Sequence, residues 1–144
     1  MEKSPMINLV YASSAHELLK EGELLEILEK AREKNTRLGI TGMLLYRGGN
    51  FLQVLEGEAE TVRELYKVIR QDQRHKGVML ISERPVTERH FSEWKMAFVN
   101  LQSVKPEDVP GYSDFLNIKF EGDTFATNPT FAHRLLRIFR DYMR

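Results

Sequence analysis

The sequence contains no cysteine among its 144 residues. This absence excludes disulfides, thiolate metal ligands and a cysteine nucleophile. A chain without cysteine suits a reducing compartment. The start of the chain also lacks a signal-peptide pattern, and no apolar run approaches the roughly 18 residues of a membrane-spanning helix. These absences together predict a cytoplasmic protein.

The chain has no net charge either, because 21 basic residues balance 21 acidic ones. A neutral chain has no overall attraction to nucleic acid or to an anionic membrane, so neither partner is expected. Phosphate-binding and nucleophile motifs of the P-loop, GxGxxG and GxSxG types are missing. The histidines His16, His90 and His133 lack metal-ligand spacing and are expected at the surface.

The apolar residues that are present predict an alternation of strands and helices. Strand-like runs cover residues 7–12, 40–47, 51–56, 78–82 and 94–99. Helical spacing covers 24–31 and 62–72, with a break expected from Asn35 to Gly39. Gly48-Gly49-Asn50 predicts a hairpin, because such turns need positive φ. The βαββαββ order predicts an α+β, ferredoxin-like sheet with the first and third strands adjacent and both helices on one face.

Residues 101–144 are expected to form a C-terminal helical extension to a domain of residues 6–100. Asn128-Pro129 predicts the start of a helix. Its apolar residues form two neighbouring stripes, Phe131/Leu135/Ile138/Tyr142 and Ala132/Leu136/Phe139/Met143. One stripe suffices to pack a helix on its own domain, so the width predicts a homo-oligomer formed through this helix. The alternative is that the extension covers the open face of the sheet and uses both stripes there.

A glutamine interrupts an apolar strand face. Gln53 lies between Phe51 and Leu55, and Tyr11 is expected beside it on the neighbouring strand. A buried amide without a partner costs roughly 1–3 kcal/mol, so a polar group must lie against Gln53. Tyr11 and Gln53 can satisfy each other.

Alternatively, a flat heterocyclic ligand lies between the two helices. Its faces would be buried against Ile27 and Ile69, and Asn35 would supply a second amide. Further along, Trp94, Met96 and Phe98 are expected to share one strand face, where spacing alone predicts core packing.

Five motifs in order resemble the BLUF family of flavin-based blue-light sensors, in its short single-domain type, over about residues 6–100. The FLQVLEG stretch is the most specific of them. The motifs are Leu9-Val10-Tyr11-Ala12-Ser13, Asn35 with Gly39-Ile40-Thr41-Gly42, Phe51-Leu52-Gln53-Val54-Leu55-Glu56-Gly57, Asp72-Gln73-Arg74-His75 and Phe91-Ser92-Glu93-Trp94-Lys95-Met96.

The resemblance implies a non-covalently bound flavin, FAD with FMN as the alternative, held between the two helices. Tyr11 and Gln53 would form a light-driven switch, and Trp94 and Met96 would sense the change at Gln53. The remaining expected flavin contacts are Asn35, at the pyrimidine edge, with Ile27, Ile69, Asp72, Arg74 and His75. Lys34 departs from the family pattern, because many relatives carry Asn or His there, and a change in tuning or dark recovery is expected.

The expected function is therefore a photoreceptor that is not an enzyme and that signals to an unidentified protein or through an oligomer. Two alternatives remain. A ferredoxin-like hydrolase of the acylphosphatase kind would need a glycine- and arginine-rich anion loop before the first helix, which residues 13–17 do not resemble. A flavin-free interaction domain on the same fold is the other.

Overall fold

The computed structural model of the chain describes residues 5–15, 20–72, 75–112 and 119–143. Five strands form one sheet in the order β4-β1-β3-β2-β5. The strands are β1 (Met6–Ala15), β2 (Thr41–Arg47), β3 (Asn50–Glu58), β4 (His75–Val86) and β5 (Ala97–Asn100). The helices are α1 (Glu21–Leu38), α2 (Ala59–Gln71), α3 (Gly122–Thr127) and α4 (Pro129–Met143), with short 3-10 turns at Leu101–Ser103 and Pro106–Asp108.

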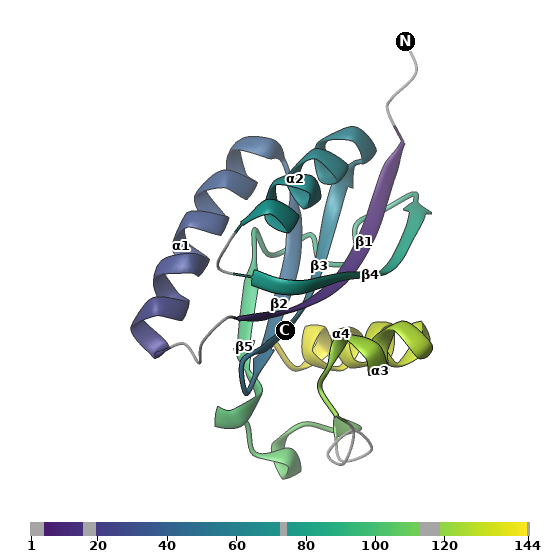
Figure 1. Cartoon of the computed structure of the whole chain (residues 1–144). Coiled ribbons are helices and arrows are strands. Elements are labelled where there is room, and N and C mark those ends of the chain that lie inside the picture. The colour runs from purple at the N-terminus through teal and green to yellow at the C-terminus, as the bar shows by residue number, and fades with distance from the viewer. Residues whose placement is uncertain (1–4, 16–19, 73–74, 113–118, 144) are drawn as a thin grey trace.

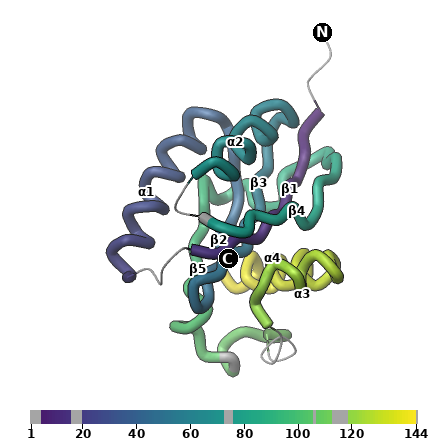
Figure 2. Tube along the Cα trace, viewed as in Figure 1, coloured from purple at the N-terminus to yellow at the C-terminus, as the bar shows by residue number. Residues whose placement is uncertain are grey.

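The sheet lies between two helical layers. Helices α1 and α2 cover one face, and α3 and α4 lie against the other (Figure 1; the same view as a tube in Figure 2). Strands β1 and β3 are adjacent and antiparallel at the centre of the sheet, as the sequence predicts. β5 joins the edge as a parallel neighbour of β2. The α+β, ferredoxin-like expectation is confirmed.

The pleat of the central strands divides the core into two clusters. Leu9, Tyr11 and Leu55 belong to the cluster under α1 and α2. Val10 and Val54, one residue along each strand, belong to the cluster under α4. Since successive side chains point to opposite faces, each central strand serves both cores. The two faces can therefore hold chemically different sites.

The hairpin and the end of the first helix both depend on glycine. Gly48 and Gly49 have φ of 54° and 88°, so the predicted tight turn is confirmed. The first helix is longer than predicted, because it continues through Asn35 to Leu38. Helical hydrogen bonding propagates through the polar residues there and ends only where Gly39 adopts φ of 69°.

The fifth strand begins later than predicted, at Ala97. The backbone before it turns, with the Trp94 amide donating to the Phe91 carbonyl at 3.1 Å. Strand alternation therefore fails here, and the expectation that Trp94, Met96 and Phe98 share a face is wrong. Trp94 packs against the core under α4, whereas Met96 and Phe98 lie in the core under α1 and α2.

The C-terminal helix α4 packs on the open face of the sheet. Both predicted stripes contribute to this contact, because Ala132, Leu135, Leu136 and Phe139 are all buried. The large apolar side chains that remain exposed lie at the end of the helix, Tyr142 (45%) and Met143 (40%). The alternative in which the extension covers the sheet thus accounts for most of its apolar width.

Among the described helices, none combines the length and hydrophobicity needed to span a membrane.

Candidate functional site

A cavity of about 150 Å³ opens between α1, α2 and the central strands. Its apolar walls come from both helices, including Ile27 and Leu28 on α1 and Leu65 and Ile69 on α2. Tyr11 and Gln53 form part of its floor; the other lining residues are Lys30, Ala31, Lys34, Asn35, Leu44, Phe51, Leu55, Val68 and Asp72. A slot with aliphatic sides and a polar floor suits a flat ring with a hydrogen-bonding edge.

Three buried side chains form a directed hydrogen-bond chain in the floor. Tyr11 and Gln53 face each other in the β1–β3 register, and the Tyr11 hydroxyl donates to Gln53 Oε1. Gln53 Nε2 in turn donates to the sulfur of Met96 at 3.2 Å. Each of the two hydrogen bonds therefore has a defined donor, and the two partners of Gln53 fix the orientation of its amide. The mutual pairing of Tyr11 and Gln53 considered from the sequence is present.

The Tyr11 phenol is strongly biased toward its neutral form. Burial, followed by the proximity of Tyr66 and Asp72, raises the pKa of Tyr11 far above its usual value. The Tyr66 ring lies 5.4 Å from the Tyr11 ring, centroid to centroid. Tyr11 therefore holds its proton at any physiological pH.

Helix α1 clamps the segment that carries Met96. Asn35 Nδ2 donates to the Lys95 carbonyl at 2.7 Å, and Arg32 Nε donates to the Met96 carbonyl at 2.9 Å. Sequence reasoning missed Arg32, although it lies three residues before Asn35 and so on the same helix face. Because both bonds hold the backbone beside Met96, the position of its sulfur is tied to α1.

Glu56 is a second residue that sequence reasoning missed. Its carboxylate is fully buried and accepts hydrogen bonds from the His90 and Phe91 amides, both at 2.8 Å, and from Asn8 Nδ2 and Thr41 Oγ1. It anchors the loop that leads to Trp94 and Met96. A glutamate inside an apolar strand motif was the available sequence signal, since a buried carboxylate needs several donors.

The structure brings most of the predicted site residues together but not all. Ile27, Asn35, Ile69 and Asp72 line the same cavity as Tyr11 and Gln53. Lys34, the departure from the family pattern, also lines it. Arg74 lies outside the described residues, and His75 is described only as the first residue of β4. Trp94 lies on the opposite side of the sheet, 6.4 Å from the Phe91 ring by centroid.

Of the histidines expected at the surface, His16 lies outside the described residues, and the expectation for His133 needs a correction. His133 is half-buried, because α4 packs on the sheet, and its Nε2 lies 2.9 Å from Ser82 Oγ. It is not a free surface residue. Within the described residues no cluster of three or more histidine, aspartate or glutamate side chains is arranged to hold a metal ion.

A family model described as BLUF, sensors of blue-light using FAD, matches residues 6–97. The chain belongs to the BLUF family. This membership identifies it as a flavin-binding blue-light sensor, and the acylphosphatase-like and flavin-free alternatives are not favoured. The aliphatic slot with the Tyr11–Gln53 floor fits the flat ring that this family binds.

Curated relatives contain the matching region within longer proteins. The photoactivated adenylate cyclase subunit beta of Euglena longa is 38% identical over 94 residues, which cover 65% of this chain and 11% of that protein. The blue light- and temperature-regulated antirepressor BluF of Escherichia coli K12 is 28% identical over 138 residues, covering 96% and 33%. The chain thus spans a third or less of the length of these relatives.

A solved structure resembles nearly the whole chain. The dark-state structure of the BLUF protein BlrB has a TM-score of 0.78 at 27% identity and covers 96% of this chain and 97% of its own. The similarity extends beyond the sheet and its two covering helices to the C-terminal helices. The arrangement in which these helices pack on the sheet therefore recurs in a relative of similar length.

Proposed function

We propose that this BLUF chain senses blue light through the buried chain of Tyr11, Gln53 and Met96, and that it performs no catalysis of its own. The hydrogen-bonded floor of the helix-lined cavity is the observation that carries the proposal. The flavin, when bound, supplies a chromophore for blue light that on excitation can oxidise a nearby phenol. Ile27 and Ile69 would hold its ring, with Asn35 at its polar edge.

The proton on Tyr11 is the element that moves. In the structure the Tyr11 hydroxyl donates to Gln53 Oε1, so the proton already points along the path it would take. Its raised pKa keeps it in place until an electron leaves the phenol. When the electron returns, Tyr11 regains its proton, but the Gln53 amide can be left rearranged, by rotation or by tautomerisation.

Rearrangement of Gln53 would release Met96. After a half-turn of the amide, Oε1 would face the Met96 sulfur, which has no proton to donate, so the 3.2 Å contact would lose its attraction. Met96 is fixed to α1 through Arg32, and Trp94 two residues earlier packs under α4. This short segment connects the two faces of the sheet, which supports a role for Met96 and Trp94 in passing the change outward.

Substitution of the switch pair tests the proposal. Tyr11→Phe and Gln53→Leu should retain flavin, because the cavity walls are intact, but should lose the light-induced red shift of the visible absorption band. Tyr46→Phe is a matched control, since Tyr46 is buried on β2 but does not line the cavity. A normal, reversible shift in either switch variant would refute the assignment.

We propose FAD, rather than FMN, as the flavin of this slot. A second hollow, of about 440 Å³, continues from it along α2 and shares Lys34, Leu65 and Val68 with it. This hollow is also lined by Glu58, Glu60 and Glu64, so the proposal of FAD depends on the space available to a longer flavin and not on charge. Chromatography of the flavin released on denaturation should yield FAD; release of FMN alone would contradict this extension.

The output is proposed to pass through α4 to a partner protein or a second copy of the chain. Tyr142 and Met143 are the exposed apolar residues at its end. Size-exclusion chromatography with light scattering should show a homo-oligomer that Tyr142→Lys or Met143→Lys reduces in size. A monomer at micromolar concentration, in darkness and in blue light, would refute oligomerisation through this helix.

A further inference from the structure

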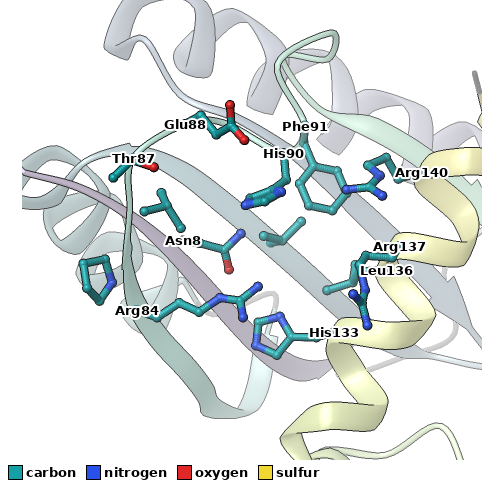
Figure 3. Close-up of a pocket in the computed structure, with 13 residues that line it drawn as sticks. Asn8, Arg84, Thr87, Glu88, His90, Phe91, His133, Leu136, Arg137 and Arg140 are labelled. Atoms are coloured by element: carbon teal, nitrogen blue, oxygen red, sulfur yellow. The ribbon is translucent and has the colours of Figure 1, made fainter.

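A larger cavity, of about 620 Å³, lies on the face of the sheet opposite the proposed flavin slot. It opens between α4 and the end of β4 with the turn that follows (Figure 3). Nothing in the light-sensing scheme uses it. The side chains around it differ from those of the flavin slot, because they combine several cations with an unpaired amide oxygen and an apolar wall.

Positive charge gathers from two sides of this cavity. Arg84 reaches in from β4 and Arg137 from α4, as Figure 3 shows. Arg140 also lines it but is paired with Asp141, 3.1 Å away. In the part of the chain that the structure describes, no ion pair is found for Arg84 or Arg137. Glu88 is the carboxylate on the rim. Guanidinium groups converging on one space attract a phosphate or carboxylate.

The floor of the cavity contains an unsatisfied acceptor. Asn8 is 1% exposed, and its Oδ1 has no hydrogen-bond partner within the described residues. Asn8 Nδ2 donates to Glu56 Oε2 at 3.2 Å, and a flipped amide would place oxygen against the carboxylate. Glu56 therefore fixes the orientation, and Oδ1 is left on the side of Arg84 and His133 (Figure 3). A ligand with an N–H or O–H donor would satisfy it.

The electrostatics of His133 support a shared anion site. Burial, followed by the charges of Arg84 and Arg137, lowers the pKa of His133 to about 4. The charges of both arginines therefore make the electrostatic potential positive in the part of the cavity that this imidazole faces. His133 is neutral at physiological pH and remains bonded to Ser82, so it adds polarity without charge.

We propose that this cavity binds a small organic phosphate that also carries a hydroxyl or amino donor. Its phosphate would lie between Arg84 and Arg137, and its donor would bond to Asn8 Oδ1. Its less polar part would lie against the wall formed by Phe91 and Leu136. Because α4 forms one side, an occupied cavity would tie this helix to the sheet, independently of the flavin on the other face.

Isothermal titration calorimetry of the full, flavin-loaded chain in the dark tests the proposal. The probes are adenosine monophosphate, ribose 5-phosphate, adenosine and inorganic phosphate. At least one of the two organic phosphates should bind saturably, and adenosine and inorganic phosphate should bind at least tenfold more weakly. Comparison of adenosine monophosphate with ribose 5-phosphate shows whether the cavity prefers a nucleotide or a sugar phosphate.

Variants locate the binding. Arg84→Ala and Arg137→Ala should each weaken it at least tenfold; both side chains are exposed, so the fold should be retained. Arg134→Ala is the matched control, because this exposed arginine of α4 does not line the cavity. Binding of inorganic phosphate as tight as that of the organic phosphates would overturn the proposal. Binding that is unchanged in both variants would also overturn it, and would indicate that the phosphate binds elsewhere, for example at Lys30 and Lys34 beside the flavin slot. Absence of saturable binding by both organic phosphates below millimolar concentration would overturn it as well.

Discussion

Replacing Glu56 with glutamine should destabilise the protein well beyond what the loss of one charge suggests. The two carboxylate oxygens divide their donors: Oε1 accepts from the Phe91 amide and Thr41, and Oε2 accepts from the His90 amide and Asn8. In Glu56→Gln one oxygen becomes an NH₂ group. Thr41 can rotate its hydroxyl and Asn8 can turn its amide, but a backbone N–H cannot reverse.

One backbone amide, of His90 or Phe91, is therefore left facing a donor in either orientation of the glutamine. An unsatisfied buried group costs about 1–3 kcal/mol, and the bonds that survive lose their charge assistance. The expected loss is about 3 kcal/mol of unfolding free energy, or roughly 10 °C in Tm for a chain of this size.

Urea denaturation and thermal unfolding measure this loss directly. Glu58→Gln is the matched control: Glu58 is exposed and ends the same strand, so a change within about 0.5 kcal/mol is expected. A loss below about 1 kcal/mol in Glu56→Gln would refute the reasoning, because it would mean that the loop can rotate its amides to other acceptors. The Glu56 variant should also recover more slowly or incompletely from light, since this loop leads to Trp94 and Met96.

Three further predictions concern other parts of the chain. Ile69→Glu should give folded protein that is poor in flavin by absorbance, because a charge replaces one wall of the slot; full occupancy would contradict the site. The pKa of His133 in the folded state lies below its unfolded value near 6.5. The free energy of unfolding therefore has its full value above pH 6.5 and decreases as the pH falls toward 4. His133→Gln should reduce this loss of unfolding free energy at low pH by about 1–2 kcal/mol, a value that allows for solvent screening of the half-exposed ring. Gly42→Ala should lose more than about 3 kcal/mol, because its Cβ would collide with the Val54 carbonyl, whereas Gly22→Ala has open space and should be neutral or stabilising in the same melt.

Much of the fold could be predicted because it depends on local patterns. The two-residue alternation of β1 and β3, the helical spacing under α2 and the paired glycines of the hairpin each depend on neighbours in the chain. The same alternation placed Tyr11 beside Gln53, and the register of the central strands confirms that adjacency. The polar interruption at Gln53 was visible because every other residue around it on that face is apolar.

The position of the segment before β5 could not be predicted, because it depends on contacts with distant residues. A turn at Phe91–Trp94 breaks the strand period, so Trp94 and Met96 reach opposite faces of the sheet. No local pattern indicates this, because the turn is held by the distant carboxylate of Glu56 and by the backbone bond from Gly42 to Trp94.

The family, the order of the five strands with their two covering helices, and the Tyr11–Gln53 pair could all be inferred from the sequence, since each follows from residues close in the chain or in strand register. The hydrogen bond from Arg32 to the Met96 carbonyl and the convergence of Arg84 and Arg137 near Asn8 appear only in the folded chain. The residues within each group are separated by 53 to 129 positions, and their proximity depends on how α1 and α4 pack on the sheet. Such long-range placement comes from the burial of whole faces, which no short stretch of sequence encodes.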